Sequence, residues 1–239
     1  MTTLEKLTFD HAGKSLTGEV ARPEGEGLFP AVPVMANALG LGAQTREAAA
    51  ALAGLGYLAV ATDMFGGAAY LADPSQAGDD YLALMASPGL LRARAVAWFE
   101  TVAALADVDA TRMAAIGYCF GGCCVLELAR SGVDVRAVVS YHGILTTLNP
   151  AAPGAIKGEV AAYCGGQDPY APQDSIEGLH RELTAAGASH HITVFAEAKH
   201  GFTDTDAQKH GHPGIAYDKV AHRVSWAGTL ALLETVLKG

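Results

Sequence analysis

Short apolar segments alternate along this chain with longer segments of helical periodicity. Six apolar segments have the length of buried strands and lie at 31–36, 57–62, 112–118, 137–141, 160–164 and 191–195. Helical patterns lie at 46–55, 89–106, 123–129, 172–186 and 215–237. Strands that alternate with helices predict an α/β fold, in which helices cover both faces of a mainly parallel sheet.

The first part of the chain departs from this alternation. Two segments of strand-like alternation, 4–9 and 14–21, predict an antiparallel hairpin. Thr45 is the expected N-cap of the first helix. Segments without periodicity indicate loops and lie at 37–42 and 66–78. Because the chain has no linker, repeat or low-complexity tract, residues 1–239 are expected to form one domain.

Composition limits the classes of function. The 239 residues carry a net charge of −9, which disfavours nucleic acid and anionic membranes as partners. No apolar run is long enough to span a bilayer, and residues 1–10 lack the apolar core of a secretion signal. We therefore expect a globular cytoplasmic protein that acts on a small molecule, as a monomer or a homodimer.

Four cysteines add a limit on chemistry. Cys119, Cys123 and Cys124 lie within six positions of one another, which is a poor arrangement for a disulfide framework. Cys164 is the fourth, and no C-x-x-C pair indicates a zinc or thioredoxin-like centre. Histidines and aspartates gather at 204–212 without a standard metal spacing, and we interpret that segment as a solvated surface loop. Neither a metal nor a cofactor is expected.

The segment Gly117-Tyr118-Cys119-Phe120-Gly121-Gly122 carries the strongest chemical signal. It stands between an apolar strand and a helix and contains G-x-C-x-G, the nucleophile-elbow pattern with cysteine in place of serine. A side chain at Gly117 or Gly121 would collide with neighbouring backbone in so sharp a turn. The turn places the thiol of Cys119 at a helix N-terminus, which favours the thiolate. Taken alone, Cys119 is equally explained as a small buried hydrophobe.

Polar side chains follow the predicted strands at the edge where α/β sheets bind ligands. They are Asn37, Asp63, Cys119, His142, Asp168 and His200. Three of them, Cys119, Asp168 and His200, occur in the α/β-hydrolase order of nucleophile, acid and histidine. Turn chemistry also explains Asp168, and a loop position explains His200, but their common order favours a catalytic triad. His142 is the weaker candidate for the base, because the base comes last in that order.

Together these motifs resemble the dienelactone hydrolase family. The likeness rests on the elbow segment, on the turn that contains Asp168 and on His200-Gly201-Phe202, and it extends over nearly the whole chain. The resemblance implies an α/β-hydrolase fold and a Cys-Asp-His triad. In that triad Cys119 is the nucleophile, His200 is the base and Asp168 orients the base.

Attack by Cys119 on an ester carbonyl requires donors for the oxyanion. By position these are the N–H groups of Phe120, just after the nucleophile, and of Ala38, in the loop after the 31–36 strand. His200 takes the thiol proton or holds the thiolate as an ion pair, and then activates the water that cleaves the thioester. The side chains expected to line the substrate pocket are Asn37, Phe65, Tyr70, His142, Phe202 and Asp204.

Two positions differ from the pattern of the family's founding members. Those enzymes carry a glutamate at the position of Asn37, which holds the resting cysteine as a thiol, so Cys119 is expected here to rest as a thiolate. They also carry an arginine shortly after the histidine to bind a substrate carboxylate, whereas this chain has Asp204, which repels an anion. We therefore expect a neutral or aryl ester as substrate, with phosphotriesters as further electrophiles.

Two other interpretations stay open. The same triad suits a true dienelactone (carboxymethylenebutenolide) hydrolase, another lactonase or a thioesterase. A non-catalytic sensor would instead use Cys119 as a redox-sensitive thiol on a hydrolase scaffold. The full triad argues against a sensor, because a sensor has no need of Asp168.

Overall fold

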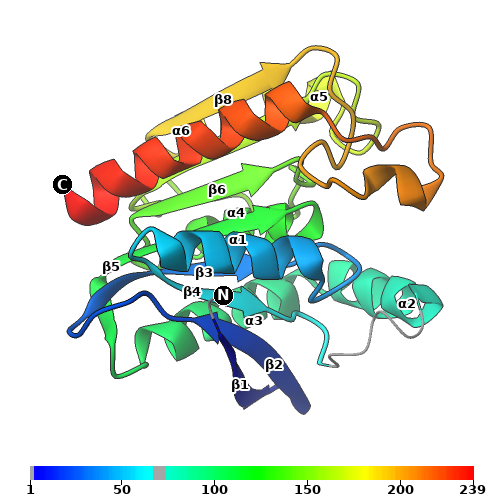
Figure 1. Ribbon diagram of the computed structural model, residues 1–239. Coiled ribbons are helices and arrows are strands. Elements are labelled where there is room, and N and C mark those ends of the chain that lie inside the picture. Colours follow the sequence, from blue (N-terminus) through cyan, green and yellow to red (C-terminus); the bar gives the residue numbers. More distant parts are fainter. Residues whose placement is uncertain (1–2, 67–73) are drawn as a thin grey trace.

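The computed structural model describes residues 3–66 and 74–239 and shows an eight-stranded sheet between two layers of helices (Figure 1). The strands are β1 (Leu4–His11), β2 (Lys14–Ala21), β3 (Phe29–Met35), β4 (Leu58–Thr62), β5 (Val108–Tyr118), β6 (Ala137–Tyr141), β7 (Glu159–Gly165) and β8 (His190–Phe195). The α-helices are α1 (Ala43–Gly54), α2 (Pro74–Met85), α3 (Pro88–Ala103), α4 (Phe120–Arg130), α5 (Gln173–Ala185) and α6 (Lys219–Lys238).

The strand order is β1-β2-β4-β3-β5-β6-β7-β8. The predicted hairpin, β1 and β2, is antiparallel and continues the sheet through an antiparallel pairing of β2 with β4. Every pairing from β4 to β8 is parallel. This mainly parallel sheet confirms the predicted α/β-hydrolase fold, and the parallel strands direct their carboxyl ends to one edge of the sheet.

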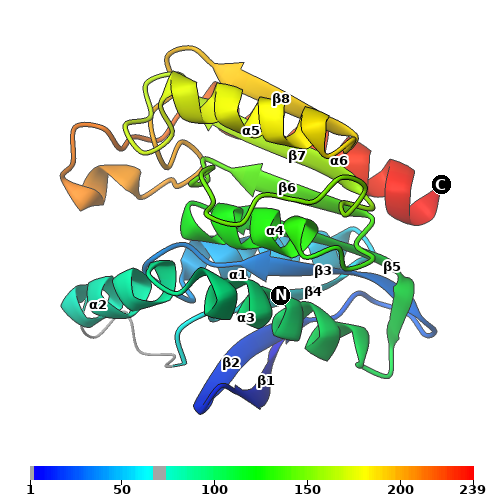
Figure 2. The same ribbon diagram turned by 180° about the vertical axis from the view of Figure 1, so that it is seen from behind.

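Helices cover both faces of the sheet. α1 and α6 lie on the face toward the viewer in Figure 1, and α3, α4 and α5 lie on the opposite face, as Figure 2 shows. The central strands β4 and β6 are buried along their whole length, which is why their sequences are continuous apolar runs without alternation. The sheet thus divides the apolar core into two clusters, one under each helical layer.

The starts of two helices differ from the sequence prediction. α1 begins at Ala43 with Gly42 as its N-cap, so Thr45 lies buried in the first turn and caps nothing. α6 begins at Lys219 rather than at 215, because the side chain of Asp218 accepts hydrogen bonds from the N–H groups of Val220 and Ala221. In both cases local hydrogen-bonding geometry sets the boundary within a longer periodic pattern.

Residues 66–78, predicted as a loop, include the first turn of α2, which begins at Pro74. A short 3-10 helix, η1 (Ala207–His210), was also not predicted and lies in the long connection between β8 and α6. Both elements lie beyond the carboxyl ends of the strands (Figure 1). Within the described residues, no helix combines the length and apolar character that a membrane span requires.

Candidate active site

Cys119 stands at the junction of β5 and α4, in the turn that the elbow motif predicts. Its backbone angles are φ 55° and ψ −114°, a conformation that costs strain for a residue with a side chain. A Cβ atom at Gly121 would overlap the backbone of Met35, and one at Gly117 would overlap the backbone of Gly121. The two glycines therefore allow the close approach of β3, β5 and α4 that presents the thiol at the sheet edge.

Asp168 and His200 meet beside this turn. Asp168 follows β7, His200 follows β8, and the imidazole Nδ1 lies 2.8 Å from the Asp168 carboxylate Oδ2. The other carboxylate oxygen accepts a 2.8 Å hydrogen bond from the backbone N–H of Tyr170. Both side chains are buried, at 4% and 6% exposure. Because both oxygens of Asp168 are engaged, the carboxylate is held in one orientation and in turn fixes the imidazole ring.

The surroundings of His200 favour its protonated form. Burial acts to lower the pKa of the imidazole, but hydrogen bonds to Asp168 and to Cys119 outweigh it and raise the pKa to about 10. His200 therefore carries a positive charge at neutral pH, between a carboxylate on one side and the thiol group of Cys119 on the other. A positive charge on His200 would stabilise negative charge on the neighbouring sulfur.

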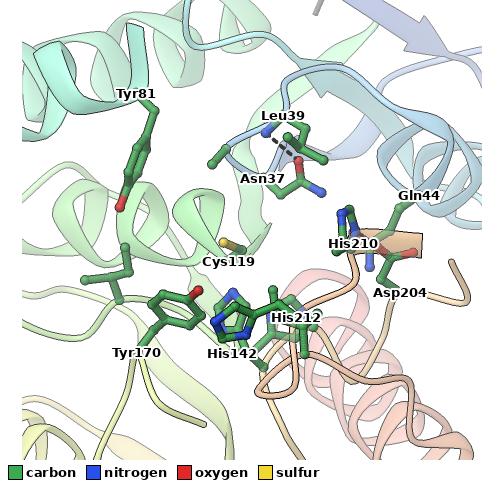
Figure 3. A pocket seen from close by; sticks show the side chains of 15 residues that line it. Asn37, Leu39, Gln44, Tyr81, Cys119, His142, Tyr170, Asp204, His210 and His212 are labelled. Atoms are coloured by element: carbon green, nitrogen blue, oxygen red, sulfur yellow. Dashed lines mark hydrogen bonds and ion pairs between the residues drawn. The ribbon is translucent and has the colours of Figure 1, made fainter. Parts of the chain in front are cut away.

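A cavity of about 300 Å³ opens above Cys119. Figure 3 shows its walls, with Tyr81 from α2, Asn37 and Leu39 from the loop after β3, and Tyr170 from the turn after Asp168. Cys119 and His200 both line it. The catalytic candidates therefore open onto a space of a size suited to a small organic molecule.

Most of the predicted pocket residues can be located relative to this cavity. Asn37, His142 and Asp204 line it. The prediction was wrong for Phe65 and Phe202, because both side chains are buried in the core, at 2% and 0% exposure, and neither lines the cavity. Phe65 stacks on Phe120, and Phe202 packs edge-on against His142. Tyr70 lies outside the described residues.

The two predicted oxyanion donors lie near the thiol by position. Phe120 is the first residue of α4, and the N–H groups in the first turn of a helix have no acceptor within the helix. Ala38 lines the cavity together with Cys119, in the loop that follows β3. The side chain of Asn37 holds this loop, since its amide oxygen accepts a 2.9 Å hydrogen bond from the N–H of Leu39 (Figure 3). The loop carrying Ala38 is thus locally ordered.

His142 belongs to the wall of the site. Its ring meets that of His200 edge-on at 5.2 Å, and its Nε2 atom lies 2.8 Å from the hydroxyl of Thr203. That hydroxyl also accepts a 2.8 Å hydrogen bond from the amide of Gln44. Burial, followed by the nearby charge of His200, holds the pKa of His142 well below its usual value, so its ring is neutral. The network joins the loop of His200 to β6 and α1.

Among the residues that the sequence analysis did not place at the site, five polar or aromatic ones also line the cavity: Gln44, Tyr81, Tyr170, His210 and His212. The last two belong to the segment interpreted as a solvated loop, and both are exposed while they also line the cavity. Nε2 of His210 lies 3.1 Å from the Asp204 carboxylate, and Nδ1 of His212 accepts a 3.0 Å hydrogen bond from the N–H of Gly214. Among the described residues, no group of three or more metal-ligating side chains is assembled.

No lysine or arginine belongs to the described part of the cavity lining. The guanidinium of Arg46 pairs with Glu19, that of Arg92 pairs with Glu127, and that of Arg94 donates to the carbonyl of Met64. These arginines are thus engaged elsewhere. None of them replaces the carboxylate-binding arginine that the resemblance led us to look for.

Known proteins resemble this chain in sequence and in structure. A family model described as "Dienelactone hydrolase family" matches residues 16–237. A Salmonella typhimurium protein named "Putative carboxymethylenebutenolidase" is 30% identical over 230 residues, which cover 90% of this chain and 83% of that protein. The solved structure named m3DLH is 34% identical, with a TM-score of 0.92 over 99% of both chains. A crystal structure of P91, a dienelactone hydrolase-like promiscuous phosphotriesterase from metagenomic libraries, is 32% identical, with a TM-score of 0.89 over 98% of both chains.

Proposed function

This chain belongs to the dienelactone hydrolase family and is a hydrolase, and we propose that it cleaves small neutral esters through Cys119 as a covalent nucleophile. The observation that carries the proposal is the line formed by Asp168, His200 and Cys119, in which His200 is hydrogen-bonded to Asp168 at 2.8 Å and both neighbours raise its pKa. Such a line is expected of a catalytic triad and has no role for a lone structural thiol.

The first chemical step is attack on the ester carbonyl by the thiolate of Cys119. His200, protonated at neutral pH, stabilises the thiolate and gives its proton to the departing alcohol. Asp168 holds the proton on Nδ1 and thereby directs Nε2 toward the reacting atoms. Now neutral, the imidazole takes a proton from water, and the hydroxide formed displaces the thiolate from the acyl group.

The oxyanion of each tetrahedral intermediate requires donors on the side opposite the imidazole. We assign this role to the backbone N–H groups of Phe120 and Ala38. The first is aligned by the start of α4, and the second lies in the loop held by the side chain of Asn37. Two preorganised donors in a largely buried site stabilise the intermediate without reorganisation at the moment of reaction.

The lining of the cavity supports a neutral substrate. Tyr81 and Tyr170 provide aromatic surface on two walls, and Leu39 and Ile144 add aliphatic surface. Among the described residues of the lining, Asp204 has the one carboxylate, which would repel an anionic group. We therefore favour an aryl ester of a small acid over a dienelactone or another anionic substrate.

Phosphotriesters are a second candidate substrate class. The observation that favours them is the similarity to P91, whose printed description is a promiscuous phosphotriesterase. A phosphotriester is also neutral, and the same two N–H donors suit a phosphoryl oxygen. The thiolate would then form a phosphoryl-enzyme that water hydrolyses.

Turnover of p-nitrophenyl acetate by the wild-type protein and by Cys119→Ala tests the mechanism. We expect the variant to lose at least about 10⁴-fold in kcat, because the covalent route is removed. Cys123→Ala is the matched control, since that thiol is buried on α4 and should leave kcat nearly unchanged. Full activity in Cys119→Ala would exclude Cys119 as the nucleophile. A preference for a dienelactone over the aryl ester would contradict the proposed substrate class.

A further inference from the structure

A second cavity lies between α1 and α6, beside the catalytic one. Its volume is about 390 Å³, and it shares Gln44 and Asp204 with the catalytic cavity, so these two side chains separate the two spaces. Cys119 and His200 line only the catalytic cavity. The chemistry proposed above therefore leaves the second cavity without a role.

One wall of this cavity carries the hydroxyl group of a largely buried tyrosine. Tyr118 lines the cavity, is 4% exposed, and stacks its ring on that of Tyr141 at a centroid distance of 4.9 Å. Burial is the sole influence on its pKa and raises it, so the hydroxyl stays protonated. No other described residue forms a hydrogen bond with this hydroxyl. The oxygen is not one of the buried polar atoms that lack a partner, so it keeps contact with solvent in the cavity. An acceptor on a ligand can take the place of water there.

The remaining walls suit a flat apolar group. The indole of Trp226 forms part of the α6 side, and the small side chains of Ala48 and Ala51 form part of the α1 side. An aromatic ring can pack against an indole while small side chains leave room for its edge. Most of the surface available to a ligand is therefore aromatic or aliphatic.

The charges around this cavity balance or are already engaged. The carboxylate of Asp204 pairs with His210, and that of Asp206 pairs with Lys209. Arg223 and Glu47, which also line the cavity, are exposed and of opposite sign. No single charge dominates, and the cavity thus favours a neutral ligand.

We propose that the cavity between α1 and α6 is a second ligand site, which takes a neutral aryl compound with one acceptor oxygen. The ring of the ligand packs on Trp226, and the oxygen accepts a hydrogen bond from the hydroxyl of Tyr118. The site is separate from the thiol of Cys119, so occupancy does not require hydrolysis.

Acetophenone is a suitable probe, because it is a neutral aryl ketone that has no bond for the enzyme to hydrolyse. The chain has two tryptophans, and Trp98 is fully buried under the opposite face of the sheet, with its Nε1 bound to the carbonyl of Asp63. Trp226 is partly exposed in the cavity. Quenching of tryptophan fluorescence during a titration therefore reports occupancy beside Trp226.

Binding in the catalytic cavity can be separated from binding in the second one. Iodoacetamide will alkylate Cys119 selectively, because the other three cysteines are at most 3% exposed, and the added group fills the space above that thiol. Ala51→Leu instead fills the second cavity from an exposed position on α1. Ala50→Leu places the same side chain at a position on α1 that does not line the cavity and serves as the matched control.

We expect acetophenone to quench tryptophan fluorescence in a saturable way. The quenching should persist after alkylation of Cys119 and in Ala50→Leu, and it should be lost in Ala51→Leu. Tyr118→Phe should weaken acetophenone binding by about two- to tenfold, the effect of one hydrogen bond, and leave the binding of ethylbenzene unchanged. Circular dichroism verifies that each variant is folded. Quenching that persists in Ala51→Leu, that is lost on alkylation, or that never saturates would overturn the proposal.

Discussion

The elbow around Cys119 and the wall formed by Asp204, His210 and His212 line one cavity, yet the sequence specifies them in very different ways. The elbow is built from residues adjacent in the chain, and its glycines are required by backbone contacts with Met35 and Gly121. The wall depends on His210 and His212, which reach the cavity because the connection between β8 and α6 folds over the sheet edge. Local sterics therefore determine the position of the proposed nucleophile, whereas tertiary packing determines which side chains surround it.

The largest expected effect is at the elbow. In Gly121→Ala the added Cβ overlaps the backbone of Met35, and neither β3 nor α4 can move without disturbing the core. We expect a loss of stability of at least about 3 kcal/mol in urea unfolding and loss of esterase activity. Gly78→Ala is the control, since a Cβ there meets no atom within 4 Å and alanine favours the helix. Equal stability of the two variants would contradict a steric requirement at the elbow.

The next effect tests the residue that orients the base. Asp168→Asn retains the shape but removes the charge that holds the imidazole of His200 in its protonated state. We expect kcat for p-nitrophenyl acetate to fall on the order of 10²–10⁴-fold. Asp174→Asn, on the exposed side of α5, should leave kcat unchanged. A loss below twofold in Asp168→Asn would remove Asp168 from the triad.

The raised pKa of His200 also predicts a pH dependence of stability. The folded protein holds the imidazole proton up to a pKa of about 10, whereas the unfolded chain releases it near 6.5. The contribution to stability is therefore fully present below pH 6.5 and is lost as the pH rises toward 10. The urea midpoint should fall over this range in the wild-type protein and fall less in Asp168→Asn. Parallel curves of urea midpoint against pH for the two proteins would show that the pair of His200 and Asp168 does not contribute to stability.

The smallest expected effect is at the wall. Asp204→Asn removes a carboxylate from the cavity lining while leaving a side chain of similar size. We expect KM for an anionic aryl ester to fall about two- to fivefold and KM for a neutral one to stay within about twofold. Asp206→Asn is the control, because that exposed carboxylate pairs with Lys209 and does not line the catalytic cavity. A larger change for the neutral ester would point to a structural role for Asp204.

The fold and the catalytic candidates could be predicted from the sequence for physical reasons. Buried parallel strands read as continuous apolar runs, so β4 and β6 could be located closely. The carboxyl ends of such strands share one edge of the sheet, which brings Cys119, Asp168 and His200 together although they are far apart in the chain. Even so, the predicted starts of α1 and α6 were wrong, because the start of each helix depends on its N-cap, Gly42 for α1 and Asp218 for α6.

The cavity wall could not be predicted in the same way. Phe202 and His212 are both ring-bearing residues in the connection after β8, yet one is buried in the core and the other faces the cavity. Tyr170 is adjacent to the Asp168 turn, but only the fold shows its ring edge-on against that of His200 at 4.7 Å. Such positions carry no periodicity, because irregular backbone gives no regular alternation of inward and outward side chains.

The sequence by itself thus determined the layered sheet, the elbow and the order of the catalytic candidates, since each depends on local sterics or on strand direction. Tertiary structure alone decided the composition of the cavity, the hydrogen bonds that charge His200 and the second cavity beside Tyr118. Those features arise where segments far apart in the chain meet, and contacts between distant segments leave no pattern in any one of them.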